Sequence, residues 1–327
     1  MRLESIGRLI RWSDWYDSKI PFFMLAYYYL LRLGGNPRIS DLVLMVPLWV
    51  SLSALAAFGY MANDYFDVKI DALAGKRRPI SRVPPATRVA LLGLTITGGI
   101  LSFVPFASNI NALVLLLASY VLALTYSAPP IRLKERGALG MLSVSLAQRV
   151  LPLIVVFAIF DHFGVDTLIL SALSLMIGLR WILIHQVHDR PLDEKAGVST
   201  YVTGKASEKM IDILFWLVWS EVVLLSVALI VMCRSYSGLL VMALLYLLFQ
   251  IYLFPYWRRL GRNNLLLSYR YAPLSDLYFL WLPFTMASSL VLLNRWFLIL
   301  LVVELFWKKR YLRLDLFLAT RPWGRDP

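Results

Sequence analysis

Cysteine is nearly missing from this sequence. Cys233 is the single example in 327 residues, so the chain forms no internal disulfide and its thiol content says nothing about the redox compartment. Charge is scarce as well: Asp, Glu, Lys and Arg make up 16% of the residues, against about 25% in soluble domains. Apolar residues reach 59%, and the mean hydropathy is +0.67. A soluble globule of this length cannot bury so much apolar surface, so we expect the chain to lie in a bilayer.

Acidic residues are outnumbered by basic ones, 20 to 33, which leaves a net charge of +13. The basic residues lie in short clusters between apolar runs, which is the pattern of cytosolic loops in a membrane protein. We therefore expect no nucleic-acid partner. The segment before residue 20 carries four basic residues but no apolar core followed by a cleavage site, so we expect the first apolar run to be an anchor.

Ten apolar runs are candidates for membrane spans, each of which needs about 20 mostly apolar residues. They are 20–33, 41–62, 87–106, 110–126, 139–160, 166–187, 211–232, 237–256, 275–291 and 296–307. The last two form either a hairpin or one long broken helix, so we predict nine or ten spans. The predicted fold class is an all-α, multi-pass transmembrane bundle. Because no long soluble segment is present, we expect 1–327 to be one polytopic membrane domain.

Lysine and arginine predict the orientation of these spans. One set of loops holds 27 of the 33 basic residues and the opposite set holds only Arg38, Arg234 and Arg295. This asymmetry places the basic set in the cytosol. It also favours a hairpin for the last two runs, because a hairpin returns Lys308 and its basic neighbours to the cytosolic side. We expect a multi-pass protein of the cell (inner) membrane.

A short acidic pattern occurs twice, in segments 63–75 and 185–197, with every matched position offset by 122 residues. The copies read Asp67-x-x-x-Asp71-x-x-Ala74-Gly75 and Asp189-x-x-x-Asp193-x-x-Ala196-Gly197. Four predicted spans lie between them. An even number preserves the orientation, so we expect a parallel repeat with both motifs on the cytosolic face.

The first copy places oxygen ligands at helical spacing. If the second span continues as a helix, Asn63, Asp67 and Asp71 share a face, with Asp64 on the neighbouring edge. We expect these side chains to converge, and their mutual repulsion calls for a cation between them. Hard oxygen ligands favour Mg²⁺ or Ca²⁺ over zinc. The alternative is a solvated, charged loop.

The second copy offers imidazoles beside the carboxylates. Asp189 and Asp193 share a face if Pro191 lies in the first turn of a new helix, and His185 precedes Asp189 by four residues. A zinc or iron site made with His188 is a rival hypothesis. The first motif has no imidazole or thiolate, however, so we expect His185 to hydrogen-bond a carboxylate or a water of the metal cluster, or to be a packed polar residue.

Basic side chains follow both acidic motifs, in the same loops and in the loop after Tyr126-Ser127. They are Lys76, Arg77, Arg78, Arg132, Lys134, Lys195, Lys205 and Lys209. For most of them, cytosolic loop charge is explanation enough. Acids and bases on one face also suit a metal–diphosphate complex. The sequence contains no Walker loop, which argues against a nucleoside triphosphatase.

Three motifs together resemble the UbiA superfamily of intramembrane prenyltransferases, over roughly residues 15–300. They are Asn63-Asp64-Tyr65-Phe66-Asp67-Val68-Lys69-Ile70-Asp71, Tyr126-Ser127 with Lys134, and Asp189-Arg190-Pro191-Leu192-Asp193, with Arg78-Pro79 as a further match. The resemblance implies about nine spans around a central cavity, cytosolic helical caps, and a tunnel open to lipid.

The resemblance also implies roles for individual residues. Metal ligands would be Asn63, Asp67, Asp71, Asp189 and Asp193, holding Mg²⁺ on a polyprenyl diphosphate. Diphosphate contacts would come from Lys19, Arg78, Tyr126, Ser127, Arg132, Lys134 and Lys195. We expect Asp67 and Asp189 to be indispensable for turnover and Asp64 to remove the acceptor proton. Carbocation character at the allylic carbon could be stabilised by aromatic faces such as Tyr65, Phe66, Tyr126 and Trp181.

Arg149 lies near the middle of the fifth predicted span, where a charge is costly. Two interpretations stand: it pairs with an anionic acceptor, or it forms an internal ion pair, for which Glu221 is the candidate. His185 is a second candidate for acceptor contact. No sequence pattern here ties the chain to one acceptor.

The leading functional hypothesis is Mg²⁺-dependent transfer of a prenyl group to an aromatic or quinone-precursor acceptor. Alternatives within the superfamily are a terpene cyclase and a phosphoribosyltransferase acting on a lipid phosphate. A polytopic transporter is a further alternative. Transporters place charged sites near the midplane of the membrane, whereas both acidic motifs here lie at one face. The expected partners are the polyprenyl diphosphate, a lipophilic or aromatic acceptor, and membrane lipid.

Overall fold

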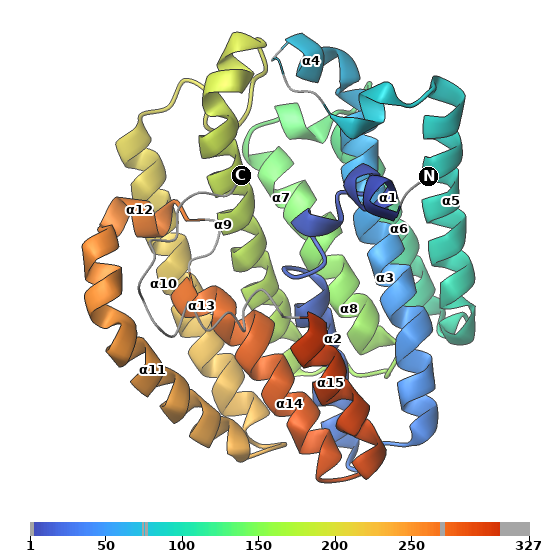
Figure 1. Ribbon diagram of the computed structural model, residues 1–327, viewed down its shortest axis with the longest axis vertical. Helices are drawn as coiled ribbons and strands as arrows, with labels where there is room; N and C mark the ends of the chain where they lie inside the picture. Colours follow the sequence, from blue (N-terminus) through green and yellow to red (C-terminus); the bar gives the residue numbers. More distant parts are fainter. Residues whose placement is uncertain (1–2, 74, 76–77, 269–271, 308–327) are drawn as a thin grey trace.

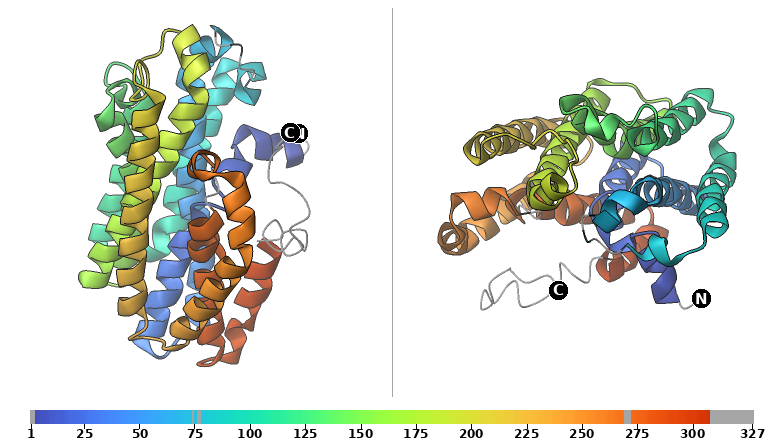
Figure 2. Two further views of the ribbon diagram at one scale, coloured as in Figure 1. Left: turned by 90° about the vertical axis from the view of Figure 1, so that its left-hand side faces the viewer. Right: turned by 90° about the horizontal axis from the view of Figure 1, so that it is seen from above.

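The computed structural model describes residues 3–73, 75, 78–268 and 272–307, and every regular element within them is a helix (Figure 1). Eight helical stretches are long and apolar enough to cross a membrane. They are α3 (Ile39–Phe66), α5 with its short extension η3 (Pro85–Phe106), α6 (Ile110–Ser127), α7 to α8 (Ala138–Ala158), α9 (Val165–Lys195), α10 (Ser207–Met232), α11 (Gly238–Leu260) and Leu274–Val291. The predicted all-helical membrane fold is confirmed, and these helices run roughly side by side (Figure 2).

Helix α2 (Ile20–Gly34) is the ninth apolar helix, and it is shorter, with 15 residues. Every residue from 20 to 31 is buried. A helix that is apolar on all sides is a core helix, and α2 packs against α3, α8 and α14 (Leu282–Val291). The first predicted span is therefore the central helix of the bundle.

The last two apolar runs form a hairpin, which resolves the choice between one broken helix and two helices. After α14, the chain turns at residues 292–294, passes through η7 (Arg295–Phe297) and continues as α15 (Leu298–Trp307), which packs back on α14 (Figure 1). The buried Glu304 of α15 accepts a hydrogen bond of 3.0 Å from Tyr28 of α2. The predicted return of Lys308 to the cytosolic side lies outside the described residues.

Two of the long helices contain a five-residue π-helical segment. η5 (Leu146–Val150) joins α7 (Ala138–Ser145) to α8 (Leu151–Ala158), and η6 (Leu277–Trp281) joins α13 (Ala272–Asp276) to α14. Each segment ends two residues before a proline, Pro152 or Pro283. Proline lacks an N–H and crowds the carbonyl four residues earlier, and the wider π turn accommodates both effects.

The loops gather at two ends of the bundle, as the basic residues predict. At one end, Arg32 donates to the carbonyl of Ser235 at 3.3 Å, and Asn294 donates to the carbonyl of Pro37 at 3.1 Å. At the other end lie the short helix α4 (Val68–Leu73) and the C-terminal end of α9, which carry the two acidic motifs (Figure 1). Both copies of the repeat are therefore at the same end, which we call the motif end.

Short helices lie outside the spans. α1 (Leu3–Leu9), η1 (Trp12–Asp14), η2 (Pro79–Arg82) and η4 (Leu133–Glu135) precede or join spans on the motif side, and α12 (Arg262–Leu266) follows α11. Three of them carry or adjoin basic residues that reach the acidic motifs, as described below. They correspond to the helical caps that the resemblance implies.

Candidate active site

The first acidic motif begins at the end of α3 and continues past a bend. Helix α3 ends at Phe66, Asp67 has a non-helical backbone, and α4 begins at Val68. Helical hydrogen bonds nevertheless bridge the bend: the N–H of Asp67 bonds the carbonyl of Asn63 at 3.0 Å, and that of Asp71 bonds the carbonyl of Asp67 at 2.7 Å. The spacing of four that places these residues on one face is preserved.

The carboxylate of Asp67 is clasped by two cations from the loop between α6 and α7. Arg132 reaches one oxygen at 3.0 Å and Lys134 contacts the other. Lys134 also donates to the side-chain oxygen of Asn63 at 3.3 Å, and Ser127 donates to the same oxygen at 3.2 Å. Burial lowers the pKa of Lys134, and the nearby Asp67 offsets only part of that effect.

Asp64 and Asp71 are held by cations from two other segments. Arg11, just before η1, contacts Asp64 at 3.1 Å. Arg78, at the start of η2, contacts Asp71 at 3.4 Å and Asp64 at 3.9 Å. Asp64 is only 1% exposed. Burial by itself would lower the pKa of Arg11, but the charges of Asp64 and Asp14 outweigh it and raise that pKa.

The carboxylates of the first motif do not converge on one another, contrary to the prediction. Among the described residues, no group of three or more His, Cys, Asp or Glu side chains lies close enough to share a metal ion. Each carboxylate of the first motif instead contacts an arginine or lysine side chain, which relieves the repulsion between the carboxylates. The site is thus a set of carboxylates clasped by arginine and lysine.

The second motif differs from expectation in its backbone. Pro191 does not start a new helix: α9 runs without a break from Val165 to Lys195. Proline is tolerated in membrane helices because neighbouring groups satisfy the freed carbonyl. His185, Asp189 and Asp193 therefore share one face of a single helix.

The two histidines of the second motif point to different partners. His185 lies 3.8 Å from a carboxylate oxygen of Asp189, which is ion-pair range rather than hydrogen-bond range. His188 bonds the backbone carbonyl of Leu267 at 3.0 Å. The zinc hypothesis required both imidazoles on one ion, and the described side chains do not bring them together.

Tyr126 lies near both motifs, and the charges of Asp67 and Asp193 both act on its hydroxyl. Lys195, by contrast, is exposed at the end of α9, and Lys205 stacks over Tyr201 at 3.1 Å from the ring centre. Lys76 and Arg77 lie outside the described residues.

Lys19 lies deeper than the other predicted diphosphate contacts. Its ammonium sits 4.4 Å above the ring of Tyr60, one helical turn before Asp64 on α3, and donates a hydrogen bond to Gln148. Burial lowers the pKa of Lys19 well below the usual lysine range, and the positive charge of Arg149 lowers it further.

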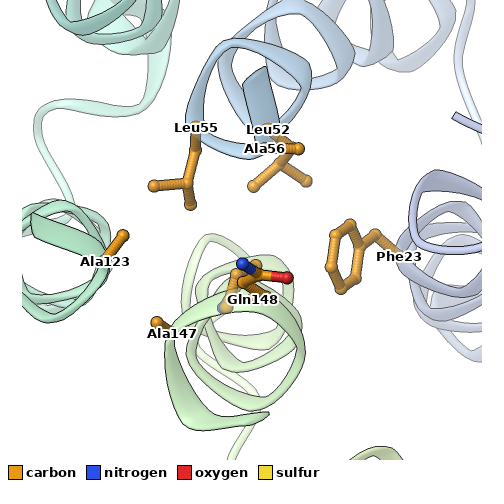
Figure 3. A pocket seen from close by; sticks show the side chains of 8 residues that line it. Phe23, Leu52, Leu55, Ala56, Ala123, Ala147 and Gln148 are labelled. Carbon is orange, nitrogen blue, oxygen red and sulfur yellow. The ribbon is translucent and has the colours of Figure 1, made fainter. Parts of the chain in front are cut away.

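A narrow apolar cavity continues along α3 below Tyr60. Its free interior is small, about enough for one water molecule. Its lining comes from four segments: Phe23 of α2, Leu52, Leu55 and Ala56 of α3, Ala123 of α6, and Ala147, Gln148 and Pro152 of η5 and α8 (Figure 3). A central cavity is thus present, but it is far smaller than a typical ligand pocket of roughly 300–1,000 Å³.

Arg149 does not pair with Glu221, so the predicted internal ion pair is wrong. Glu221 is taken by Arg180, with Nε–Oε1 and Nη2–Oε2 distances of 2.5 and 3.1 Å, and it accepts a hydrogen bond from Tyr278 at 2.9 Å. Arg149 instead donates to the carbonyl of Ser18 at 3.1 Å.

Sequence reasoning missed two residues of this site, Arg11 and Gln148. Arg11 resembles ordinary loop charge in the sequence, although it meets a buried carboxylate in the fold. Gln148 directly precedes a charge in an apolar span, which was the available signal for it.

Comparisons with known proteins show similarity in sequence and in fold. The sequence model of the UbiA prenyltransferase family matches residues 20–282. Digeranylgeranylglyceryl phosphate synthase from Thermococcus sibiricus is 25% identical over 188 residues, which is 57% of this chain and 64% of that one. The chloroplastic chlorophyll synthase of Arabidopsis thaliana is 26% identical over 161 residues, 47% of this chain and 42% of that one. The matches therefore span about half to two thirds of the relatives' length.

Solved structures share the fold. A UbiA homolog from Archaeoglobus fulgidus bound to GPP and Mg²⁺ superposes with a TM-score of 0.57 at 17% identity, covering 87% of this chain and 99% of that one. A structure concerned with digeranylgeranylglyceryl phosphate synthase in membranes gives a TM-score of 0.51 at 17% identity, over 91% and 97% of the two chains.

Proposed function

The chain belongs to the UbiA prenyltransferase family, and from that premise we propose that it transfers a prenyl group from a polyprenyl diphosphate to a lipophilic or aromatic acceptor, with Mg²⁺. One observation carries the proposal: the order of side chains along α3. The clasped carboxylates lie at its end, Tyr60 lies one turn deeper, and the apolar cavity follows at Leu52 to Ala56. A ligand with a highly charged head and a long apolar tail matches this order.

The donor chemistry of both motifs fits Mg²⁺. Asn63, Asp67 and Asp71 of the first motif and Asp189 and Asp193 of the second offer hard oxygen atoms, which Mg²⁺ prefers. When bound, the ion neutralises charge on the diphosphate and makes it a better leaving group. The homolog from Archaeoglobus fulgidus bound to GPP and Mg²⁺ supports this part of the proposal.

The clasping cations supply the rest of the charge balance. Carboxylates that would attract a metal ion are held here by Arg78, Arg132 and Lys134. If a metal ion took over these carboxylates, the three cations would be free to bind phosphate oxygens. Tyr126 and Ser127 line the same end of α6. Together these groups stabilise the negative charge that develops on the diphosphate as the allylic C–O bond breaks.

The buried acid completes the mechanism. Tyr60 lies between the motif and the cavity, where its ring holds the cations of Lys19 and Arg11 at 4.4 and 4.8 Å. The acceptor forms its new bond to the allylic carbon and loses a proton. Asp64, buried on the neighbouring edge of the motif, is the base we assign, and Arg11 and Arg78 hold its carboxylate in position.

The names of the relatives favour transfer over the alternatives. The two relatives are named as synthases, one of digeranylgeranylglyceryl phosphate and one of chlorophyll, which supports transfer to an acceptor rather than cyclisation of the donor or phosphoribosyl transfer. The transporter hypothesis is disfavoured because both acidic motifs lie at one end of the bundle.

We further propose that residues 1–327 form one polytopic domain of the cell membrane built on the repeat at 63–75 and 185–197, with the motif end in the cytosol. The concentration of basic residues in the motif-end loops supports this orientation.

Diphosphate release distinguishes these reactions. Purified protein is incubated with Mg²⁺ and prenyl diphosphates of increasing chain length, with and without lipophilic and aromatic acceptors, and the lipid products are identified by mass spectrometry. The proposal predicts release that depends on an acceptor. Release without an acceptor, together with a cyclic hydrocarbon product, would indicate a cyclase instead.

A further inference from the structure

Arg149 is a buried cation held by a backbone carbonyl and two aromatic rings. It is 4% exposed and belongs to the π-helical segment η5. Its guanidinium donates to the carbonyl of Ser18 at 3.1 Å and lies 5.3 Å from the ring of Trp181 and 5.8 Å from that of Phe279. Within the described part of the chain it forms no ion pair, because the nearby Glu221 is already held by Arg180.

Lys19 is a second cation of the same kind. It is also 4% exposed, and its contacts are the side-chain oxygen of Gln148 and the face of Tyr60. No carboxylate pairs with it among the residues that the structure describes. Burying a charge without a partner is strongly destabilising, and an anion beside Lys19 and Arg149 would offset that cost.

The fold places the two cations together by a pair of crossed contacts. Arg149 bonds the backbone of Ser18, the residue before Lys19, while Lys19 bonds the side chain of Gln148, the residue before Arg149. The charge of Arg149 also acts directly on Lys19. The π segment matters here because its wider turn re-aims side chains, and such segments are frequent at functional sites.

This pair lies deeper in the bundle than the cations of the acidic motif. Arg132, Lys134 and Arg78 surround the carboxylates at the end of α3, whereas Tyr60, over which Lys19 lies, is one helical turn deeper, about 5 Å along the helix. Gln148 lines the apolar cavity below. The pair therefore lies between the carboxylates at the end of α3 and the apolar cavity.

We propose that Lys19, Gln148 and Arg149 form a binding site for an anionic group of the acceptor, a carboxylate or a phosphate monoester. This inference rests on the proposed function and specifies the acceptor class. Arg149 supplies the planar, multiple N–H donors that suit such oxyanions, and Lys19 adds a second charge. A neutral acceptor leaves both cations without a partner, and the site rejects it for that reason.

A binding measurement tests the site without turnover. Thermal unfolding of the purified protein is followed with two matched pairs of probes: an aromatic carboxylate and its methyl ester, and a prenylated glyceryl phosphate and the same lipid without its phosphate. The anionic member of at least one pair should raise the melting temperature, and its neutral partner should not. The pair that responds identifies whether the anion is a carboxylate or a phosphate.

Two substitutions assign the effect to these residues. Arg149→Gln should weaken binding of the anionic probe at least tenfold, and Arg149→Lys should recover part of it. Binding of a prenyl thiodiphosphate with Mg²⁺ should change less than twofold in both variants, which also shows that they fold. Arg32→Gln is the matched control: Arg32 likewise bonds a backbone carbonyl and stacks on a ring, Tyr236 at 5.3 Å, but at the opposite end of the bundle.

Three results would overturn the site: neither anionic probe stabilises the wild-type protein, Arg149→Gln binds the probe as the wild type does, or Arg149→Gln weakens the thiodiphosphate as much as the acceptor probe. The last result assigns the cations to the diphosphate. Diphosphate release is measured in parallel. Its absence with every acceptor, while the anionic probe still binds, contradicts the proposed function but leaves the anion site standing.

Discussion

Arg180 and Glu221 meet in the fully buried interior, where each is 0% exposed and Tyr278 donates to the same carboxylate. The ion pair links α9 to α10, and the hydrogen bond from Tyr278 also ties η6 to α10. Removing one member of a buried ion pair leaves an uncompensated charge, which costs about 3–5 kcal/mol, whereas replacing both members by apolar residues is often neutral. The pair therefore allows a test by single and double substitution.

Glu221→Leu should lower the melting temperature of the purified protein markedly, because Arg180 loses its counter-charge. Adding Arg180→Met should restore most of the loss. Thermal unfolding in detergent measures both. A double variant no more stable than Glu221→Leu would contradict this account of the pair.

Lys19 gives the site a pH dependence. Burial depresses its pKa in the folded chain, and the charges that act on it are those of Arg149, Asp14 and Arg11. Below this lowered pKa the ammonium is charged and attracts an anion; above it the amine is neutral. Affinity for an anionic ligand at Lys19 should therefore fall as the pH rises through a range lower than that of an ordinary lysine.

Lys19→Gln should remove this alkaline fall while reducing the affinity at neutral pH. The measurement is the dissociation constant of the anionic probe between pH 7 and 10 for both proteins. An alkaline fall of equal size in Lys19→Gln would assign the titration to another group.

Spacing in the sequence was enough to predict which acidic residues share a face at the ends of α3 and α9, because helix periodicity alone puts residues four apart on one face. Sequence spacing could not predict the partner of Arg149, which is the backbone carbonyl of Ser18. Arg149 and Arg180 are both cations inside apolar runs, and only the packing of α9 against α10 decides which of them meets Glu221. Contacts between helices depend on tertiary geometry that a single sequence does not encode locally.

At the scale of elements, apolar length predicted the helices well and their internal irregularities poorly. The shared face of Asp189 and Asp193 was predicted on the condition that a new helix starts near Pro191, whereas Pro191 lies inside α9. Pro152 and Pro283 follow π segments. All three sites show that packing in the bundle keeps a helix continuous through a proline, at the cost of a local change in hydrogen bonding.

The contact between α7 and α9 depends on a small residue. A Cβ at Gly178 would lie 2.8 Å from the Cβ and 2.9 Å from the Oγ of Ser145. Small residues let membrane helices approach closely, and overpacking typically costs about 1–3 kcal/mol. Gly178→Ala should therefore lower the melting temperature although alanine favours helix.

Gly98→Ala is the matched control, because Gly98 is also inside a helix and a Cβ at this position would meet nothing within 4 Å. It should be neutral or slightly stabilising. Equal melting temperatures for the two variants would show that α7 and α9 can move apart freely.

At the scale of the whole molecule, Cys233 reports the orientation. It is the single cysteine, half-buried directly after α10 at the end opposite the motifs. A membrane-impermeant maleimide should label it in intact cells. Burial raises the pKa of the Cys233 thiol, so labelling should proceed faster above pH 8 than at neutral pH.

The companion variant places the cysteine at the other end. Glu208 is exposed in the first turn of α10, and Glu208→Cys in a Cys233→Ser background should be labelled only after the cells are permeabilised. The reverse pattern would place the acidic motifs outside the cell.

The chain as a whole is organised along one axis: carboxylates clasped by cations at the motif end, two buried cations one turn deeper, and an apolar cavity beyond. This order, and not any single residue, is the basis for assigning a metal–diphosphate head and a prenyl tail to the site. The assignment of the diphosphate head depends on the first acidic motif, so a substitution in that motif tests it.

The most direct test measures Mg²⁺-dependent release of diphosphate by the wild-type protein, Asp67→Asn and, as a control, Asp212→Asn, whose carboxylate is exposed on α10. Loss of a group that stabilises a developing charge typically costs about 10²–10³-fold in rate. The account predicts a loss of that order in Asp67→Asn and a change of less than about twofold in Asp212→Asn. Wild-type rates in Asp67→Asn would contradict it.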